Sequence, residues 1–433
     1  MWSNVGGGTV DYVANWFLKA SSYSANGGAI PPHIAFVSTN SITQGEQVAQ
    51  IWNALFEQSM EISFGHQTFK WGSDAKGKAQ VHCVIVGLSR RENVQKIKRL
   101  FIYENAAAEP IETTCAYLSP YLIDADNLPN RFMVIPSTRN AINSAPKLRT
   151  GVQMIDNGIL TFTDEEKAEI VKLEPKSAKW LKRFAGGDEY ISGDYRWIFY
   201  LRNISPSELK SLPLLKSRVA ELKKWRLSRT RSATKKLGET PTLVGVDEQP
   251  KNDFLVIPNT SSERREYIPM GWLDTSYVAN QKLRILPDAN IFEFSVLTSA
   301  IHMAWMRTIT GRMKSDYMYS VGVVYNTFPW PALDDKAKEA LTKTGQAILD
   351  ARAEWPEATL ADLYDPDAMP ANLRKAHIAN DKAVDRLYRK QPFESERERV
   401  EHLFMLYEQL QAPLVAASKP KPRKRRPKPI KTS

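Results

Sequence analysis

Cysteine is scarce in this 433-residue chain, which contains only Cys83 and Cys115. Two isolated cysteines offer neither the paired spacing of a zinc site nor a disulfide framework, so we expect no metal centre and a reducing, cytoplasmic location. Long hydrophobic runs are also missing, because no segment approaches the roughly 20 apolar residues that a membrane helix needs. The first residues lack the basic and then apolar pattern of a secretion signal. These absences exclude a membrane span and a disulfide-stabilised secreted domain, and the length predicts two or three domains.

Patterns of catalytic residues are few as well. No Ser/His/Asp arrangement, pair of catalytic carboxylates or His/Cys ligand spacing is visible, and the histidines are scattered along the chain. His82 lies within an apolar run, where a hydrogen-bonded core histidine is the usual role. The sequence therefore argues against a free-standing enzyme built on any of these sites, and we assign no catalytic residue.

Positive charge is plentiful but uneven. The net charge is +11, and the segment Lys419–Ser433 carries eight Lys/Arg and no acid, so subtracting this tail leaves +3 for the rest of the chain. A second basic cluster lies within Lys216–Lys236, where nine Lys/Arg accompany the single acid Glu221. Such a cluster is typical of phosphate contacts with nucleic acid. A solvated helix face explains the same pattern equally well.

The beginning of the chain has the pattern of strand, helix and strand. The run Ile34–Val37 is short and continuously apolar, which is typical of a parallel strand covered on both faces. Thr43 and Glu46 fit a capping box at the start of a helix. Helical spacing then places four side chains on the buried face of that helix: Val48, Ile51, Trp52 and Leu55.

Further strands and helices follow along the chain. Two strands are predicted at Met60–Phe64 and Ala79–Leu88, with a polar loop over His66–Lys78 between them. Beyond residue 95 a mixed region contains a buried strand at Tyr195–Leu201, and β-rich sequence resumes at Phe254–Pro258. The Pro/Lys/Arg tail cannot bury a core and is expected to be disordered. Apolar spacing predicts helices in four places: Phe292–Thr310, Asp335–Glu354, Asn380–Lys390 and Glu394–Leu410.

Six separated segments resemble one protein family, in that family's order. The segments are Asp11–Trp16, Val37–Gln47, Phe69–Trp71, Ser261–Pro269, Gly311–Ser320 and Tyr325–Pro331. They resemble the MmeI-like family of adenine-N6 DNA methyltransferases and single-chain restriction–modification proteins. The resemblance runs from about Asp11 to Leu410, so most of the chain takes part in it.

The resemblance implies an α/β fold that corresponds to the C-terminal half of the family's chain. It implies a partial Rossmann-like methyltransferase sheet containing only the last strands, then an α+β target-recognition domain and a C-terminal helical region. Residues 1–95 would end the methyltransferase domain, and residues 96–204 would connect it to the target-recognition domain at 205–332. Residues 333–412 would form the helical domain, followed by a disordered basic tail at 413–433.

Other parts of the family's chain are not visible in this sequence. These are an N-terminal nuclease, a helical connector, a glycine-rich loop for S-adenosylmethionine and an Asn-Pro-Pro-Tyr/Phe catalytic loop. Pro31-Pro32 has no preceding Asn, and Gly6-Gly7-Gly8 follows no strand, so neither fits those loops. The catalytic loop aims the adenine amino group at the methyl donor, and that orientation is lost without it. The resemblance thus implies S-adenosylmethionine as cofactor, but we assign it no residues and expect this chain alone to be inactive.

The resemblance covers the part of the methyltransferase domain that would hold a flipped adenine. An enzyme that acts on a base within a duplex takes that base out of the stack, and an aromatic side chain offsets part of the cost. Phe69 occupies the family's position for the stacking aromatic, and Trp71 is the alternative. Simple packing within the hairpin is the competing explanation for both rings.

Base reading is expected from residues 205–332. Lys314 and Asp316 are two apart, so in an extended segment their side chains face the same way. Lys can donate hydrogen bonds to guanine and Asp can accept one from cytosine, so together they would suit one G·C pair. A solvated contact between the two side chains on a loop is the competing explanation. Arg312 and Tyr317 are expected as flanking contacts. Five residues are expected on phosphates, which position the protein without specifying sequence: Lys223, Lys224, Arg226, Arg229 and Arg231.

These features predict the DNA-recognising part of a site-specific adenine-N6 methyltransferase, which binds duplex DNA and holds the flipped adenine. A polypeptide carrying the N-terminal half would bring the cofactor and catalytic loops. The strand Ile34–Val37 lacks the neighbour that bears the catalytic loop, and exposed apolar edges recruit partners. Two alternatives are a standalone sequence-specific DNA-binding protein without catalysis and an inactive, truncated gene product.

Overall fold

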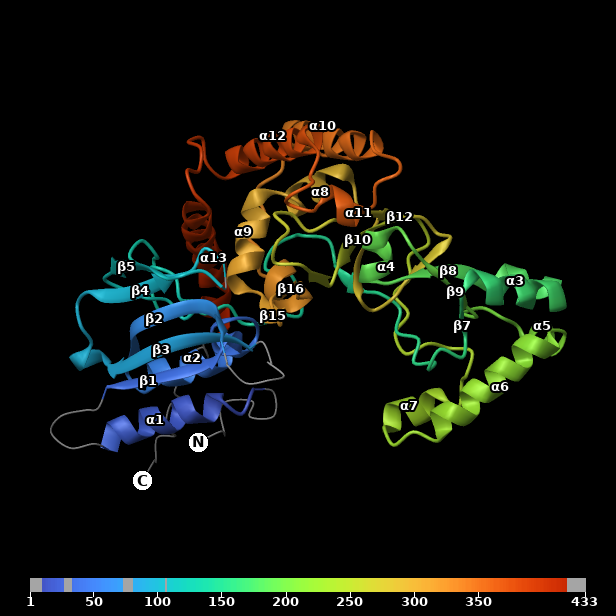
Figure 1. The fold of residues 1–433 in the computed structure, drawn as a ribbon, viewed down its shortest axis with the longest axis horizontal. Coiled ribbons are helices and arrows are strands. Elements are labelled where there is room, and N and C mark those ends of the chain that lie inside the picture. The colour runs from blue at the N-terminus through green and yellow to red at the C-terminus, as the bar shows by residue number, and fades with distance from the viewer. Residues whose placement is uncertain (1–9, 27–32, 73–80, 106, 419–433) are drawn as a thin grey trace, which may run out of the picture.

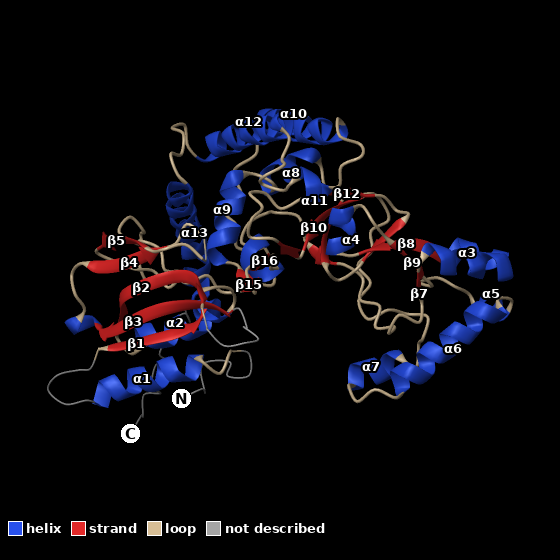
Figure 2. Cartoon of the chain, in the orientation of Figure 1, coloured by secondary structure: helices blue, strands red, loops and turns tan. Residues whose placement is uncertain are grey.

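The computed structural model describes residues 10–26, 33–72, 81–105 and 107–418 (Figure 1). The three glycines at 6–8, the two prolines at 31–32, the end of the predicted loop with the first two residues of the strand predicted at 79–88, and the tail beyond 418 lie outside these ranges. The fold is mixed α/β, with a five-stranded sheet and two helices at one end, three smaller sheets, and a helical region above them (Figures 1 and 2). Within the described ranges, no helix is long and apolar enough to cross a membrane.

The five-stranded sheet has the order β1-β3-β2-β4-β5. Its strands are β1 (Ile34–Thr39), β2 (Met60–Trp71), β3 (Val81–Arg90), β4 (Lys98–Ile102) and β5 (Ile111–Cys115). β3 is antiparallel to both β1 and β2, whereas β4 is parallel to β2 and antiparallel to β5. Among the described strands, β1 therefore forms one edge of this sheet.

Two helices pack on this sheet, α1 (Ala14–Asn26) and α2 (Gln47–Glu57). Phe17 of α1 lies against Phe36 of β1, with ring centroids 4.8 Å apart. The side chains predicted for the buried face of α2 are buried in the same core, which confirms that prediction. The opposite face of the sheet is more open, because Val37 is 50% exposed there.

Three local predictions for this region were wrong. β1 is an edge strand that pairs antiparallel with β3 and exposes alternate side chains, not a parallel strand covered on both faces. Thr43 ends a short 3-10 helix, η1 (Asn40–Thr43), and donates to the Asn40 carbonyl, so it does not cap α2. β2 continues to Trp71 through two register shifts, so residues 66–71 form strand where a loop was predicted. Such bulges interrupt the alternation from which a strand is read.

The other described strands form three smaller sheets. One contains β12 (Gly271–Leu273), β10 (Phe254–Pro258), β14 (Leu283–Pro287) and β6 (Arg149–Thr150). Another contains β13 (Tyr277–Ala279), β8 (Leu181–Ala185), β9 (Arg196–Phe199) and β7 (Thr161–Phe162). The third contains β11 (Thr260–Ser261), β16 (Asp316–Met318) and β15 (Gly311–Met313). The strands predicted at 195–201 and 254–258 correspond to β9 and β10.

The sheet of β7–β9 packs with several helices around a separate hydrophobic core. These helices are α3 (Asp164–Leu173), α5 (Pro206–Lys210) and α6 (Pro213–Leu227), and α7 (Ser232–Leu237) follows α6. We call β7–β9, α3 and α5–α7 the basic arm, and it lies at the end of the molecule opposite the five-stranded sheet (Figure 1). Its core contains Phe162 and Ile198 as well as Leu215 and Leu222, so the boundary predicted at 204/205 divides one packing unit.

The helical region joins the two ends of the molecule (Figure 1). The helix predicted at 292–310 is two helices, α8 (Ile291–Leu297) and α9 (Ala300–Ile309), because Ser299 begins a new helix as the cap of α9. α9 and α13 share the core of the five-stranded sheet, where Tyr121 packs on Phe404 at 5.9 Å. The remaining elements are α4 (Gly187–Ser192), α10 (Asp335–Ala353), α11 (Leu360–Leu363), α12 (Ala371–Tyr388), α13 (Glu396–Ser418), η2 (Arg91–Asn93), η3 (Pro175–Trp180) and η4 (Val321–Tyr325).

Candidate nucleic-acid interface

A cluster of five rings lies on β2, on β4 and just after β4, and we call it the aromatic shelf: His66, Phe69, Trp71, Phe101 and Tyr103. The rings of His66 and Phe101 stack with centroids 4.0 Å apart and 6° between their planes. Phe69 and Tyr103 also stack, at 5.4 Å and 21°. The parallel pairing of β2 with β4 sets His66 opposite Phe101, so the sheet itself brings these rings into register.

Phe69 and Trp71, the two predicted stacking residues, are held differently within the shelf. Phe69 is half-buried and rests on Tyr103, whereas Trp71 is 47% exposed and lies 6.3 Å from Phe69. The Tyr103 hydroxyl and Nδ1 of His66 form a 2.9 Å hydrogen bond. Burial and the charge of Arg99 lower the pKa of His66, so this ring is neutral at neutral pH. Phe69 is therefore supported by a ring that is itself fixed.

Sequence reasoning missed the supporting rings of the shelf. Phe101 and Tyr103 lie more than 30 positions from Phe69, and only the β2–β4 pairing brings them to it. Their alternation along the chain was the available signal, since residues two apart on a strand share a face. His66 was taken as one of several scattered structural histidines, and its hydrogen bond to Tyr103 agrees with that view.

The hairpin of β15 and β16 carries the residues predicted to read bases. Met313 pairs with Asp316, so Lys314 and Ser315 form a two-residue turn at its tip. Lys314 is exposed and its φ of 58° lies in the left-handed region. The prediction that Lys314 and Asp316 share one face of an extended segment was therefore wrong, because the turn separates them. No glycine or asparagine in this stretch signalled such a turn.

Arg312 and Tyr317 lie opposite each other on this hairpin. The Arg312 guanidinium lies 4.3 Å from the centre of the Tyr317 ring and 3.3 Å from the carboxylate of Glu263. Tyr317 is buried, and Arg312 is half-buried between its two partners. These two residues therefore brace the hairpin, while Lys314 projects its charge from the tip.

A cavity of about 490 Å³ lies between the five-stranded sheet and the hairpin. Thr68 and Tyr103 line its sheet side, and Arg312 and Tyr317 line its hairpin side. It opens where β2 and β4, which run in the same direction, end, and such strand ends are common ligand positions in α/β folds. Charges of both signs also line it: Arg264, Arg307, Glu104, Glu263 and Glu396. Tyr103 is the shelf ring that lines this cavity, and Phe69 lies behind it through its stacking on Tyr103.

The basic arm presents free positive charge on α6 and between α6 and α7. Four of its predicted phosphate contacts are exposed, and within the described part of the chain none of them forms an ion pair: Lys223, Lys224, Arg229 and Arg231. The guanidinium of Arg229 lies 4.9 Å from the centre of the Trp225 ring. Unpaired cations on an exposed helix are available to phosphates, whose contacts dominate affinity for nucleic acid.

Arg226, the fifth predicted phosphate contact, is fully buried. Burial lowers its pKa to about 10, so it stays charged at neutral pH. The prediction for Arg226 was wrong, because this residue continues the buried stripe of α6 that contains Val219 and Leu222. That helical spacing was visible in the sequence. The guanidinium donates to five backbone carbonyls: those of Met154, Ile155, Leu237, Pro241 and Leu243.

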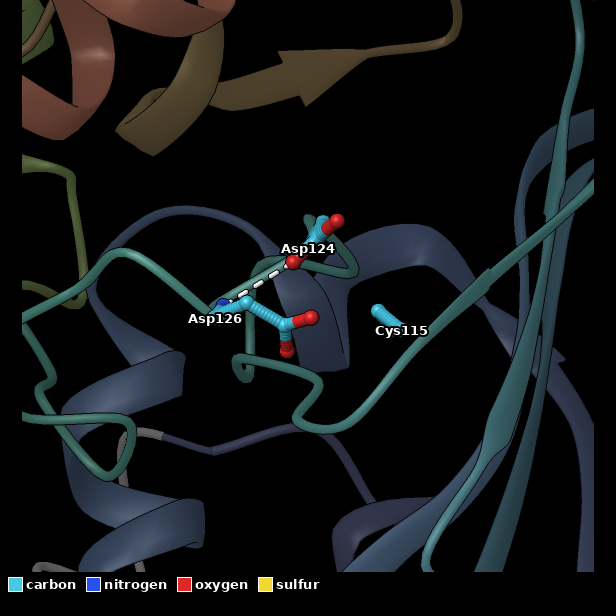
Figure 3. A group of neighbouring side chains, drawn as sticks. All are labelled: Cys115, Asp124 and Asp126. Carbon is cyan, nitrogen blue, oxygen red and sulfur yellow. Dashed lines mark hydrogen bonds between the residues drawn. The ribbon is translucent and has the colours of Figure 1, made fainter.

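Three possible metal-ligand atoms lie within 4.8 Å of one another, on the side chains of Cys115, Asp124 and Asp126 (Figure 3). Both carboxylates already have partners. Asp126 accepts the backbone N–H groups of the two residues after Cys115, each at 2.8 Å, and Asp124 accepts the N–H of Asp126 at 2.9 Å and pairs with Arg397. Burial and the two carboxylates raise the pKa of Cys115 to about 12, which keeps the thiol protonated. The group ties this loop to α13 and needs no ion to explain it.

Models of three domains of one protein family match consecutive parts of the chain. The DNA-methyltransferase domain of MmeI matches residues 2–102, its target recognition domain matches residues 129–332, and its C-terminal domain matches residues 333–415. The chain belongs to the MmeI family. Its hairpin and basic arm both fall within the match to the MmeI target recognition domain.

Two individual proteins that are similar to this chain agree with the MmeI assignment. DNA methyltransferase A of Bacillus subtilis (strain 168) is 36% identical over 404 residues, which are 93% of this chain and 44% of that protein. The structure of MmeI, a Type IIL restriction-modification enzyme, in complex with DNA is similar with 37% identity and a TM-score of 0.89, over 95% of this chain and 54% of that one. The chain thus spans about half the length of these relatives, and the predicted family and fold class are confirmed.

Proposed function

We propose that this chain is the DNA-recognising part of a site-specific adenine-N6 DNA methyltransferase. The observation that carries the proposal is that Tyr103 of the aromatic shelf lines one cavity together with Arg312 and Tyr317 of the hairpin, in a fold similar to MmeI solved with DNA. The shelf offers rings on which a flipped base stacks, and the hairpin offers polar groups for base edges in the duplex. The duplex would lie along the hairpin with its target adenine turned toward the sheet.

Phe69 is the residue that holds the flipped adenine in this proposal. Tyr103 covers one face of its ring, which leaves the other face for a base. Stacking of a base on an aromatic side chain is worth about 1–3 kcal/mol, so it offsets part of the cost of unstacking. Trp71 is the second candidate, because it is exposed and lies beside Phe69 at the end of β2.

Sequence is read in this proposal by the tip of the hairpin. The exposed ammonium of Lys314 donates to guanine O6 and N7, and Asp316, on the other side of the turn, is a separate acceptor for a cytosine amino group. Arg312 and Tyr317 flank these two contacts. Phosphates further along the duplex meet the exposed cations of the basic arm, which contribute affinity without sequence preference: Lys223, Lys224, Arg229 and Arg231.

S-adenosylmethionine is the methyl donor in the proposed reaction. A site for its ribose needs a carboxylate, as nucleotide sites in Rossmann-like folds do. The cavity of about 460 Å³ beside β1 is lined by polar, basic and apolar side chains, and no Asp or Glu is among its described lining residues. These residues do not fit the donor on their own. A methyltransferase segment paired with the free edge of β1 would supply the donor site and the catalytic loop.

A complementation assay tests this function. The chain is combined with the methyltransferase segment that it lacks relative to MmeI, and transfer of labelled methyl groups to duplex DNA is measured. We expect site-specific methylation with both polypeptides, and binding of the same site without methylation by the chain alone. Phe69→Ala should slow methylation about 5- to 150-fold, which corresponds to a lost stacking contact. Trp355→Ala, which removes an exposed ring far along the chain, should leave the rate unchanged.

The outcomes of this assay separate the competing functions. A failure of both polypeptides together to methylate any duplex would reject the proposal. If sequence-selective binding persisted in that case, the chain would be a standalone DNA-binding protein. If binding were absent as well, the chain would be an inactive product.

A further inference from the structure

The loop of residues 44–46, which we call the junction loop, lies between η1 and α2 and contacts both sides of the candidate interface. On the sheet side, Nε2 of Gln44 donates to Oγ1 of Thr68, the residue before Phe69, at 3.3 Å. On the hairpin side, the N–H of Gly45 donates to the carbonyl of Ile309 at 3.0 Å. Ile309 ends α9, and β15 begins two residues later. Figure 1 shows β15 and β16 beside the end of the sheet.

Gly45 is the point of closest approach between these two parts. Its φ is 71°, a left-handed conformation that glycine adopts without steric cost. A Cβ at this position would lie 3.1 Å from Cα and 3.2 Å from N of Gly311, the first residue of β15. Both atoms belong to the backbone, so neither can rotate away. A larger residue at position 45 therefore requires the start of the hairpin to move by a few tenths of an ångström.

The next residue of the junction loop reaches the segment that follows the hairpin. Oε1 of Glu46 accepts a hydrogen bond from Oγ of Ser137 at 3.1 Å. The N–H of Thr138 donates to the carbonyl of Gly322 at 3.0 Å, and Gly322 lies in η4, just after β16. The junction loop is thus connected to the chain on both sides of the hairpin, before β15 and after β16. This double attachment fixes the orientation of the hairpin as well as its distance from the sheet.

We infer that Gly45 is a positioning residue, which sets the distance between the base that is stacked and the bases that are read. The inference rests on the proposed function, because it takes Phe69 and the hairpin tip as the two contact points. A site-specific enzyme must modify an adenine at a fixed offset from the bases it recognises. The backbone contact between Gly45 and Gly311 fixes that offset, since it joins the start of the hairpin to the strand that carries Phe69.

Three glycine variants separate this contact from ordinary backbone strain. Gly45→Ala introduces both a left-handed alanine and a tight contact with the backbone of Gly311. Gly158→Ala introduces only the strain, because Gly158 has a φ of 78° and no atom lies within 4 Å of its added Cβ. Gly311→Ala places a methyl group on the other side of the contact with room to spare, 3.7 Å from Cα of Gly45.

The experiment uses the full chain together with the methyltransferase segment and a duplex selected by them from a random DNA pool. Each adenine of the selected site is replaced in turn by 2-aminopurine, whose fluorescence rises when the base leaves the stack. Affinity for the same duplex is measured by fluorescence anisotropy. We expect Gly45→Ala to keep its affinity within about threefold of the wild type and to lower the fluorescence rise at least about fivefold. Gly158→Ala and Gly311→Ala should change neither quantity.

A second variant covers the case in which Gly45→Ala folds poorly. Asn tolerates the left-handed backbone but still carries a Cβ, so Gly45→Asn should also lose the fluorescence rise while it keeps affinity. A full fluorescence rise in both Gly45 variants overturns the inference. A loss of DNA affinity as large as the loss of the fluorescence rise overturns it as well. The absence of any rise with the wild-type protein, at every adenine, instead overturns the proposed function on which the inference rests.

Discussion

The five-stranded sheet and the basic arm lie on either side of the hairpin, but they are held to it in different ways. The sheet shares one hydrophobic core with α9 and α13, and its junction loop touches the hairpin backbone at Gly311. The basic arm has a core of its own and exposes cations without ion-pair partners in the described chain. In the proposed function, the main fold therefore sets the geometry of the base site, and a separately packed module supplies general affinity for DNA.

The largest expected effect comes from the buried charge that holds the basic arm together. Arg226→Met should destabilise the arm by about 3–5 kcal/mol, because it leaves five buried carbonyls without their donor. Hydrogen exchange measured by mass spectrometry should show the loss of protection within residues 152–245, with residues 34–115 unchanged. This result would demonstrate that the two regions unfold independently.

Arg229→Met is the matched control for that experiment, because Arg229 is exposed on the same part of the arm and makes no ion pair within the described chain. It should alter protection in neither region. If Arg226→Met instead exposed the five-stranded sheet to exchange, the arm would be part of the main core and the comparison would fail.

The second prediction concerns the free cations of the arm. Replacing Lys223, Lys224, Arg229 and Arg231 together by Ala should weaken DNA binding about 10- to 100-fold at 0.15 M salt. The slope of log affinity against log salt should become shallower by about 3.6, which corresponds to four lost phosphate contacts. Sequence preference should stay the same, because phosphate contacts do not specify bases. Binding titrations at several salt concentrations, on selected and scrambled duplexes, measure all three quantities.

Exposed lysines elsewhere provide the control for this loss of charge. Four of them lie on α10 and α12, and their joint replacement by Ala removes the same charge from the helical region: Lys336, Lys343, Lys375 and Lys382. That variant should retain the wild-type salt slope. Equal slopes for the two quadruple variants would show that the arm contacts DNA no more than any other surface does.

The third prediction moves from the arm to the tip of the hairpin. Lys314→Ala should cost about 1–3 kcal/mol of discrimination at one G·C pair, with little change in binding to scrambled DNA. Comparing the sequences that wild-type and variant proteins select from a random pool shows which position has relaxed. Lys336→Ala is the control, since it removes one exposed lysine from α10. An unchanged preference at every position would contradict the role of Lys314.

Local periodicity and the spacing of family segments predicted much of this architecture. The buried face of α2 followed from helical spacing alone, and the ordered segments indicated the partial methyltransferase sheet. Arg226 was misassigned because charge was weighed before its place on the buried stripe of α6. Lys314 was misplaced because a tight turn without glycine or asparagine leaves no local signal.

Contacts between segments that are distant along the chain could not be predicted from the sequence. The support of Phe69 by Tyr103 depends on parallel pairing of β2 with β4, and parallel neighbours are separated by long connections. Gly45 lies within a segment that resembles the family, but the need for glycine at this position comes from a backbone contact with Gly311, more than 250 residues away. Such long-range contacts decide how the two sides of the interface face each other, so the interface itself required the structure.

The smallest expected effect is a pH response that belongs to only one of the two regions. His302 is fully buried in the main core, where burial lowers its pKa to about 3, and Nε2 lies 2.8 Å from the Tyr319 hydroxyl. The unfolded chain has a His pKa near 6.5, so it binds the proton more tightly than the folded state does. The stabilisation from neutral His302 is therefore complete above pH 6.5 and decreases as the pH falls toward 3.

His302→Gln removes this titration from the main core. Between pH 7.5 and 5.5, urea unfolding of the wild type should lose about 1.4 kcal/mol more than the variant loses, and other titrating groups cancel in that difference. His33→Gln, at an exposed position, should match the wild type. Residues 152–245 contain no histidine, so protection factors in the basic arm, which are corrected for the pH dependence of intrinsic exchange, should stay nearly constant over this range while those of the sheet decrease. An equal decrease in both regions would mean that the arm unfolds with the main core, and their separate packing would not amount to separate stability.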